Sequence, residues 1–231
     1  MKRTKKKPRE VRQPVTRELA LAKAMELADA EGLEGLSMRR LAQALGVEAM
    51  SLYHHVRNKD EILDGMVDLV FGEIAVPGED EDWRVGVRRR CESAREVLKR
   101  HRWAIGVMES RKAPGPRTLA HHDAMLACFM RAGFSLPMTG HAYAVIDAFV
   151  FGFVHTELQL PFDTGPESQA VAKAVFEAMP EGQYTAFKAF TVGHVLQPGY
   201  AFGDEFGFGL ELLFDGLERA RKREQARPGQ K

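Results

Sequence analysis

The side chains best suited to chemistry in this chain of 231 residues gather in one stretch, residues 36–59, which reads LSMRRLAQALGVEAMSLYHHVRNK. Most of them are short, basic or hydrogen-bonding, and such side chains contact the edges of base pairs and the phosphates beside them. The candidates for contact with DNA are Ser37, Arg39, Glu48, Ala49, Met50, Ser51, Tyr53, His54, His55 and Lys59.

Three of these candidates have distinct roles to weigh. Arg39 is able to pair bidentately with guanine in the major groove, and its alternative is a surface salt bridge. Lys59 stands at a predicted helix start, where free amides attract anions, so it is a candidate phosphate anchor. His55 is expected to pack or to form a hydrogen bond, with phosphate contact as its alternative.

Two short helices joined by a tight turn must position these side chains. Ser37 can cap the first helix, in which Leu41, Ala42 and Leu45 share one face. Gly46 ends that helix, because glycine adopts a positive φ at little steric cost. Ala42 is small enough to let the second helix cross closely over the first.

The second helix is predicted to begin near Glu48 and to be anchored by Leu52 and Val56, which turns the residues between them outward. A further helix is expected to follow, because Asn58 with Glu61 three residues later forms a variant of the capping box.

A helix before this pair is expected to brace it from behind. Thr16 can cap that helix, which runs from Arg17 to about Ala30 and is closed by Gly32. The helix after the pair is expected to end near Ile74, and it is the natural lever toward the rest of the chain.

This part of the chain resembles the DNA-binding domain of the TetR family of bacterial transcriptional regulators. The resemblance rests on LSMRRLA at 36–42, LGV at 45–47, SLY at 51–53, HV at 55–56 and NK at 58–59. It implies an all-α fold and a base contact by Arg39. The remaining sequence is similar, more loosely, to the family's C-terminal ligand-binding domain, as in the ending FGFGLELL at 206–213. Ala49 and Met50 replace more polar residues of the tetracycline repressor, so a different operator sequence is expected.

The distribution of charge favours a nucleic-acid partner for the N-terminal part. The net charge of the chain is only +1, but residues 1–60 hold thirteen Lys or Arg against eight Asp or Glu, a net charge of +5. A basic module on an acidic body fits a DNA reader. Residues 1–13 hold seven basic residues and one acid, and are expected to form a disordered arm that either follows DNA or only solubilises the chain.

The clearest boundary follows Val76, where Pro77 and Gly78 precede four acidic residues. The expected parts are a basic arm over 1–13, a helix-turn-helix domain over 14–76 that includes the start of the connecting helix, a ligand-binding and dimerisation domain over 77–224, and a tail over 225–231. Cys91 and Cys128 lack framework spacing, and no signal peptide or membrane span is predicted, so a reducing cytoplasm is inferred; the family resemblance implies a bacterial one.

Every segment after the boundary reads as helix, over about 82–101, 103–110, 116–131, 137–158, 168–178, 183–194 and 203–223. The long helices over 137–158 and 203–223 are the candidates for a four-helix interface between two copies, since the family resemblance implies that arrangement.

Polar side chains among large apolar ones mark the candidates for a small-molecule site, because a buried polar group needs a partner. The candidate residues are Trp103, Met108, Glu109, His122, Met125, Phe129, Asp147, Phe151 and His155. Each of them has a place in the core or at a dimer interface as its alternative. An apolar, aromatic ligand is expected, and a cationic one if an ionised Asp147 faces it.

No metal or other cofactor is expected. His121 and His122 point to different helix faces, and no histidine pair has the i, i+4 spacing of a zinc helix. In tetracycline repressors a histidine and a glutamate hold the magnesium of the drug, whereas the aligned positions here are Glu109 and Thr156, with Glu157 adjacent. Magnesium-tetracycline is therefore not the expected ligand.

Together these patterns predict a homodimeric transcriptional repressor that leaves a palindromic operator when a small molecule binds. One short helix makes too few contacts for specificity, whereas two helices about 34–36 Å apart read successive major grooves. The alternative is a DNA-binding dimer whose second domain binds a protein partner or only dimerises. An enzyme is not expected, because the sequence has no nucleophile motif and no phosphate-binding loop.

Overall fold

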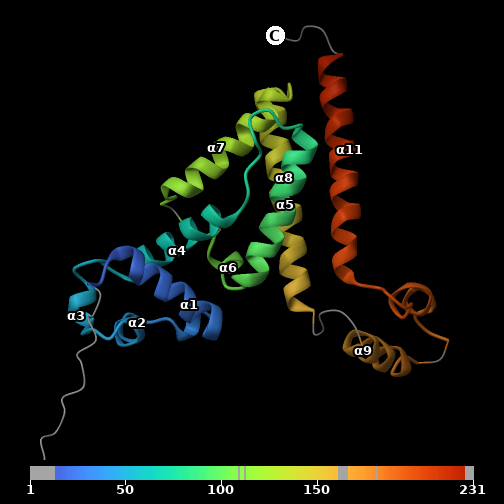
Figure 1. Cartoon of the computed structure of the whole chain (residues 1–231). Helices are drawn as coiled ribbons and strands as arrows, with labels where there is room; N and C mark the ends of the chain where they lie inside the picture. The colour runs from blue at the N-terminus through green and yellow to red at the C-terminus, as the bar shows by residue number, and fades with distance from the viewer. Residues whose placement is uncertain (1–13, 109, 112, 161–165, 181, 227–231) are drawn as a thin grey trace, which may run out of the picture. The chain divides into compact units, whose positions relative to one another are not determined.

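The computed structural model describes residues 14–108, 110–111, 113–160, 166–180 and 182–226. This part of the chain contains helices and no strand, so the predicted all-α fold class is confirmed. The helices, with a π-helix (η1) and a 3-10 helix (η2), follow in the order α1 (Arg17–Gly35), α2 (Met38–Ala44), α3 (Ala49–Leu52), α4 (Lys59–Glu73), α5 (Trp83–Arg100), α6 (Ile105–Met108), α7 (Pro116–Arg131), α8 (Leu136–Gln159), α9 (Pro166–Glu177), α10 (Thr185–Phe190), η1 (Thr191–Val195), η2 (Phe202–Asp204) and α11 (Glu205–Gln225) (Figure 1).

The chain divides into two compact units, Met1–Val67 and Asp68–Lys231. The division falls inside α4, earlier than the sequence boundary at Val76, so the last residues of this helix belong to the second unit. One continuous helix therefore contributes to both units.

The first unit is built on α1, which buries Ala20, Leu21, Ala24 and Ala28 on one face. Helical geometry places residues four apart on the same side, and small alanines there let neighbouring helices approach closely. The predicted end of this helix is confirmed in its regular part, because Gly32 leaves helical geometry with a φ of 74°.

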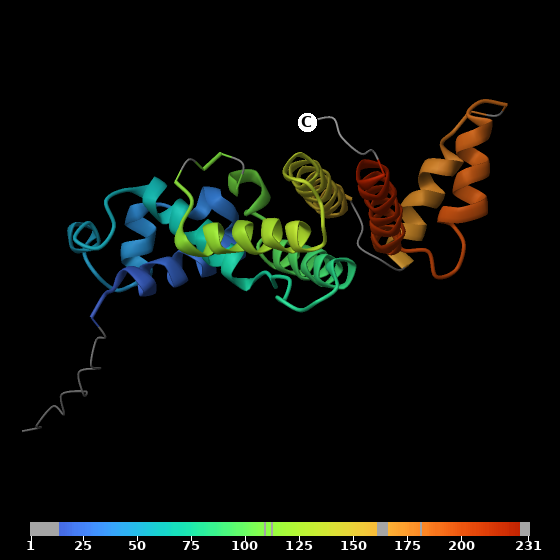
Figure 2. The ribbon, with the colours of Figure 1, turned by 90° about the horizontal axis from the view of Figure 1, so that it is seen from above.

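The second unit is a bundle in which α5 and α7 pack against α8, and α8 packs against α11. The buried side of α8 is a stripe of Ala142, Ile146, Val150 and Val154, spaced by four residues as one helix face requires. Figures 1 and 2 both show α8 and α11 side by side.

An aromatic cluster closes one end of this bundle. Trp83 at the start of α5 meets Phe134 and Phe214 edge to face, with ring centroids 5.3 and 5.6 Å apart, and Phe129 of α7 lies within the same cluster. Such edge-to-face pairs stabilise a core by about 0.5–1.5 kcal/mol beyond the area they bury.

Most predicted helices of the second unit are found within a few residues of their expected ends. Two differ: the helix expected over 103–110 is only the single turn Ile105–Met108, and the one expected over 183–194 is an α-helix that continues as a π-helix over Thr191–Val195.

Helix α8 is the one helix in the described ranges that is long and apolar enough to cross a membrane by length and composition, yet only 28% of its most apolar window is buried. Its exposed apolar surface includes Leu136 and Val145. Within this chain the helix is therefore covered on one side only.

Candidate DNA interface and ligand cavity

The helix-turn-helix is held together by local features that the sequence predicts. Ser37 Oγ accepts a hydrogen bond from the Arg40 amide at 3.2 Å and so caps α2. Gly46 has a φ of 69°, the conformation that the turn requires. Leu52 and Val56 are fully buried, so α3 is anchored as expected.

The adjacent Arg39 and Arg40 have different surroundings. Arg40 forms an ion pair with Glu31 of α1, which holds α2 against the helix behind it. Arg39 is exposed and has no ion pair with any residue that the structure describes. The surface salt bridge considered as the alternative role of Arg39 is formed instead by Arg40. The N–H donors of the Arg39 guanidinium can therefore bind DNA.

The outward face of α3 and of the turn after it consists of the residues predicted to contact DNA. Met50 is 74% exposed and Tyr53 is 44% exposed. The remaining members are exposed, namely Glu48, His54 and His55, or half-buried, namely Ala49 and Ser51. The expected packing of His55 is wrong, since its side chain is exposed.

Helix α4 begins with the predicted capping box. Asn58 Oδ1 accepts from the Glu61 amide at 2.8 Å, and Glu61 Oε2 accepts from the Arg57 amide at 2.9 Å. The hydrogen bond from the Arg57 amide also lowers the pKa of Glu61. Lys59 Nζ lies 3.4 Å from the Leu33 carbonyl, so its ammonium contacts the end of α1.

The second unit contains a cavity of about 720 Å³ between α6 and α8. Its wall is formed by Ile105, Gly106, Asp147, Ala148, Phe151, Gly152 and His155. The volume lies within the usual range of small-molecule sites, and the wall combines apolar surface with a carboxylate and an imidazole.

Two glycines widen this cavity. A Cβ added to Gly106 or to Gly152 would meet no atom within 4 Å, because the space beside both residues is open. These positions were not among the sequence candidates, since a glycine within a helix gives no sign of what it faces.

The cavity brings together three of the nine predicted ligand residues, Asp147, Phe151 and His155. Met125 and Phe129 are instead fully buried in the core of the bundle. The others do not line the wall either, namely Trp103, Met108 and His122, and Glu109 lies outside the described residues.

Behind Asp147 lies Arg90, a fully buried residue of α5 that sequence reasoning missed. The Arg90 Nη1 and Asp147 Oδ1 atoms are 2.7 Å apart, and Arg90 Nε donates to His121 Nε2 at 3.1 Å. A signal for Arg90 exists in the sequence, because it falls on the same helix face as Val87 and Ala94, both buried.

Three neutral polar groups surround this ion pair. Burial and the nearby Arg90 charge lower the pKa of His121 to about 3. Burial also lowers the pKa of His122, whose Nδ1 is hydrogen-bonded to the Tyr143 hydroxyl. Burial and Asp147 raise the pKa of Tyr143, so all three groups are uncharged at neutral pH.

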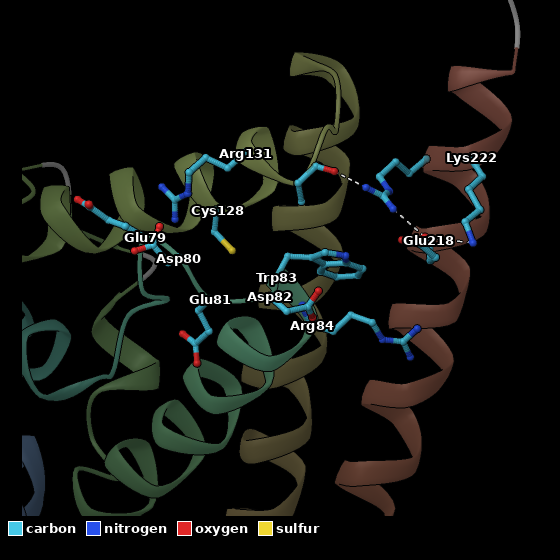
Figure 3. Close-up of a pocket in the computed structure, with 12 residues that line it drawn as sticks. Glu79, Asp80, Glu81, Asp82, Trp83, Arg84, Cys128, Arg131, Glu218 and Lys222 are labelled. Carbon is cyan, nitrogen blue, oxygen red and sulfur yellow. Dashed lines mark hydrogen bonds and ion pairs between the residues drawn. The ribbon is translucent and has the colours of Figure 1, made fainter.

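A second hollow, of about 740 Å³, lies where the loop before α5, the end of α7 and α11 come together (Figure 3). Its charged side chains are used within the chain: Arg131 donates to the Gly78 carbonyl, and Arg221 and Lys222 both pair with Glu218. Because its wall is mainly polar, this hollow suits an organic ligand less than the cavity beside α8.

Two of the three residues considered for magnesium, Thr156 and Glu157, do not fit the ion, and Glu109 lies outside the described residues. Glu157 accepts from Arg95 at 2.6 and 2.8 Å and from Lys99 at 3.0 Å, so its carboxylate is already neutralised. The Thr156 hydroxyl donates to the Gly152 carbonyl. No group of three metal-ligating side chains occurs in the part of the chain that the structure describes.

Comparison with known proteins decides the family. The profile described as "Bacterial regulatory proteins, tetR family" matches residues 20–66, and the profile "Tetracyclin repressor-like, C-terminal domain" matches residues 76–221. The chain belongs to the TetR family. The second profile begins at the boundary that the sequence indicated after α4.

Individual TetR relatives are similar along most of their length. The chain is 32% identical to the HTH-type transcriptional repressor DrrR1 of Streptomyces coeruleorubidus, over 84% of this chain and 74% of the relative. It is 30% identical to the tetracycline repressor protein class A from transposon 1721 of Escherichia coli, over 86% and 88%.

Among solved structures, the TetR family protein ActR of Streptomyces coelicolor in complex with actinorhodin has a TM-score of 0.74 to this chain. The identity is 26%, and the match covers 90% of this chain and 99% of ActR. The predicted function is confirmed at the level of the family: this TetR protein is a ligand-responsive, DNA-binding repressor, and the family is not one of enzymes.

Proposed function

We propose that the protein acts as a homodimer that reads an inverted-repeat operator with α3 and leaves it when an apolar, aromatic small molecule fills the cavity between α6 and α8. The observation that carries this proposal is the cavity wall, in which Phe151 lies beside the polar Asp147 and His155. The actinorhodin complex of ActR supports a small molecule as the ligand class.

The DNA-reading role rests on exposed side chains of the first unit. Arg39 contributes base contacts, and Tyr53, His54 and His55 contact the backbone or bases from the exposed turn after α3. Lys59, at the capped start of α4, exchanges its long contact with the Leu33 carbonyl for a phosphate.

The dimer rests on apolar surface that α8 and α11 leave uncovered. The large apolar side chains exposed on these helices are Leu136, Val145, Phe208 and Leu212. A second copy placed over them forms a bundle of four helices, as the predicted interface requires, and it buries the part of α8 that this chain leaves exposed.

The cavity and α4 are connected through a chain of contacts inside the second unit. Asp147 pairs with Arg90, Arg90 bonds His121, and the His121 ring lies 5.2 Å from the ring of Phe71 on α4. A ligand that shifts α8 therefore acts on the lever helix through packed groups, provided that it binds the two arrangements with different affinity.

Hydrogen bonds to α7 also hold the C-terminal half of α4, which contains Phe71. The Asp68 carboxylate accepts from the amide and the hydroxyl of Thr118, at 2.9 and 3.0 Å, in the first turn of α7. In this proposal a tilt of α4 changes the separation of the two recognition helices in the dimer and so releases the operator.

The experiment is a thermal-shift screen of the purified protein against a metabolite library, followed by an operator-release assay on each hit. Hits that raise the melting temperature and release DNA support the proposal. If no stabilising hit releases DNA, or if only a protein partner does so, the second domain has the alternative role of binding that partner or of holding the dimer.

A further inference from the structure

Besides His155, the ionisable groups at the cavity form an ion pair of which only one member lines the wall. Asp147 lines the wall, whereas Arg90 lies behind it, fully buried, with its Nη1 atom 2.7 Å from Asp147 Oδ1. A guanidinium that is completely removed from water requires an anionic partner, because an unpaired buried charge is strongly unfavourable. Asp147 is that partner.

The remaining groups around the pair add no charge. His121 accepts from Arg90 Nε, and His122 is bonded to the Tyr143 hydroxyl. Burial keeps both imidazoles and the phenol neutral at pH 7. Among the described residues of this cluster, only Arg90 and Asp147 are charged, so its net charge is zero.

We propose, on the basis of the proposed function, that the Arg90–Asp147 pair makes the cavity selective for neutral aromatic molecules that carry a hydrogen-bond donor. Asp147 accepts the hydrogen bond of the ligand, and Arg90 acts as a positioning residue that cancels the carboxylate charge. A cation gains little at such a site, since the attraction of Asp147 is opposed by Arg90, and a carboxylate ligand meets Asp147 first.

This inference replaces the simpler expectation drawn from the sequence, in which an ionised Asp147 selects a cationic ligand. The Asp147 carboxylate already pairs with Arg90 inside the protein. The hydrogen-bond capacity of the carboxylate, rather than its charge, is what remains for the ligand.

The test uses four probes with one aromatic scaffold, whose affinities for the full-length protein are measured by isothermal titration. Naphthalenemethanol is neutral with a donor, methylnaphthalene is neutral without one, naphthylmethylamine is a cation at pH 7, and naphthoate is an anion. For the wild-type protein we expect the alcohol to bind about tenfold more tightly than either ion, and more tightly than methylnaphthalene.

Variants of the two residues should shift this preference in opposite directions. In Arg90→Gln the uncancelled Asp147 should improve binding of the ammonium probe, relative to the alcohol, by about tenfold or more. In Asp147→Asn the uncancelled Arg90 should favour naphthoate instead. Arg90→Lys, which keeps the charge, and the double variant, which removes both charges, should retain the preference for the neutral alcohol.

The chain offers a matched control in a second ion pair between the same two helices. Glu157 of α8 pairs with Arg95 of α5, but neither residue lines the cavity. Glu157→Gln should leave the order of the four probes unchanged, so a general effect of losing an α5–α8 ion pair is distinguished from a local effect on the cavity.

The outcomes separate this inference from the function on which it rests. If the probes bind but the cation matches the alcohol in the wild type, or if the two single variants shift the preference in the same direction, the inference is wrong while the cavity remains a ligand site. If Arg90→Gln fails to fold, the probe preferences of Asp147→Asn and of the double variant test the inference instead. Binding of no probe, by the wild type or any variant up to the solubility limit, removes the cavity as a ligand site and with it the proposed function.

Discussion

At the scale of the residue, neighbouring side chains of one type have separate tasks. Arg40 uses its charge within the first unit, on Glu31, while Arg39 has no ion pair with a described residue. Two arginines of α5 show the same division, because the buried Arg90 pairs with Asp147 at the cavity wall, whereas the half-buried Arg95 pairs with Glu157 away from the cavity.

The two arginines of α2 supply a matched pair of substitutions. Arg39→Ala should weaken binding to the operator by about 1–3 kcal/mol per base contact while binding to random duplex is nearly unchanged. Arg40→Ala removes the ion pair with Glu31, which is at the surface, and should cost about 0–1 kcal/mol of stability with little loss of sequence preference.

Fluorescence anisotropy with operator and random duplexes checks both substitutions. Equal losses on the two duplexes for Arg39→Ala would contradict the base-reading role.

The two glycines of α8, Gly140 and Gly152, supply a second matched pair of substitutions. A methyl group at Gly152 enters the cavity, so Gly152→Ala should weaken ligand binding, whereas Gly140→Ala, on the same helix but not in the cavity wall, should not. Both changes should stabilise the folded protein by about 0.5–1 kcal/mol, because alanine loses less conformational freedom than glycine within a helix.

Ligand titration of the two variants tests the predicted difference in binding, and thermal melting tests the predicted gain in stability. If Gly152→Ala and Gly140→Ala bind the same ligand equally well, the cavity is not the binding site.

Residue-level prediction from the sequence succeeded where the cause is local. The caps by Thr16, Ser37 and Asn58 and the turn at Gly46 depend on neighbours within a few residues, and all are found in the structure. Arg90 was missed because its role depends on helices distant in sequence.

At the scale of the element, helix positions were predictable from apolar spacing and from proline and glycine, but the surroundings of each face were not. Met125 and Phe129 were expected beside a ligand and lie in the core instead. Periodicity identifies which face of a helix is buried, and it cannot distinguish a face that meets another helix from one that meets a cavity.

The positive charge of the first unit is concentrated in residues 1–13. Residues 14–67 contain six Lys or Arg against nine Asp or Glu, a net charge of −3, so the excess of basic residues in this unit comes entirely from residues 1–13. Because counterion release scales with the number of neutralised phosphates, we expect this arm to supply a large share of the affinity for DNA.

Deletion of residues 1–13 should therefore lower operator affinity and reduce the slope of log affinity against log salt, by about 0.9 for each phosphate that the arm neutralises. The melting temperature without DNA should stay the same, since the arm has almost nothing to bury. Anisotropy titrations at several salt concentrations and a thermal melt test both statements. An unchanged slope would make the arm a solubilising tail, and a lower melting temperature would make it part of the fold.

At the scale of the whole molecule, the proposed function requires two copies of the chain. The uncovered apolar surface of α8 and α11 and the short recognition helix both need a second chain, one for burial and the other for specificity. In vitro selection from random duplexes should accordingly yield an inverted repeat with half-site centres about 10 base pairs, or a multiple of that, apart.

The central claim is that one small molecule and the operator compete through the conformation of this dimer. The most direct test is to measure the affinity of the best hit of the metabolite screen for the dimer, alone and with the selected operator at saturation. Linkage requires that the operator weaken ligand binding by the same factor by which the ligand weakens operator binding, and we expect a factor of about 5–150. An equal affinity for the free and the operator-bound dimer would contradict the claim.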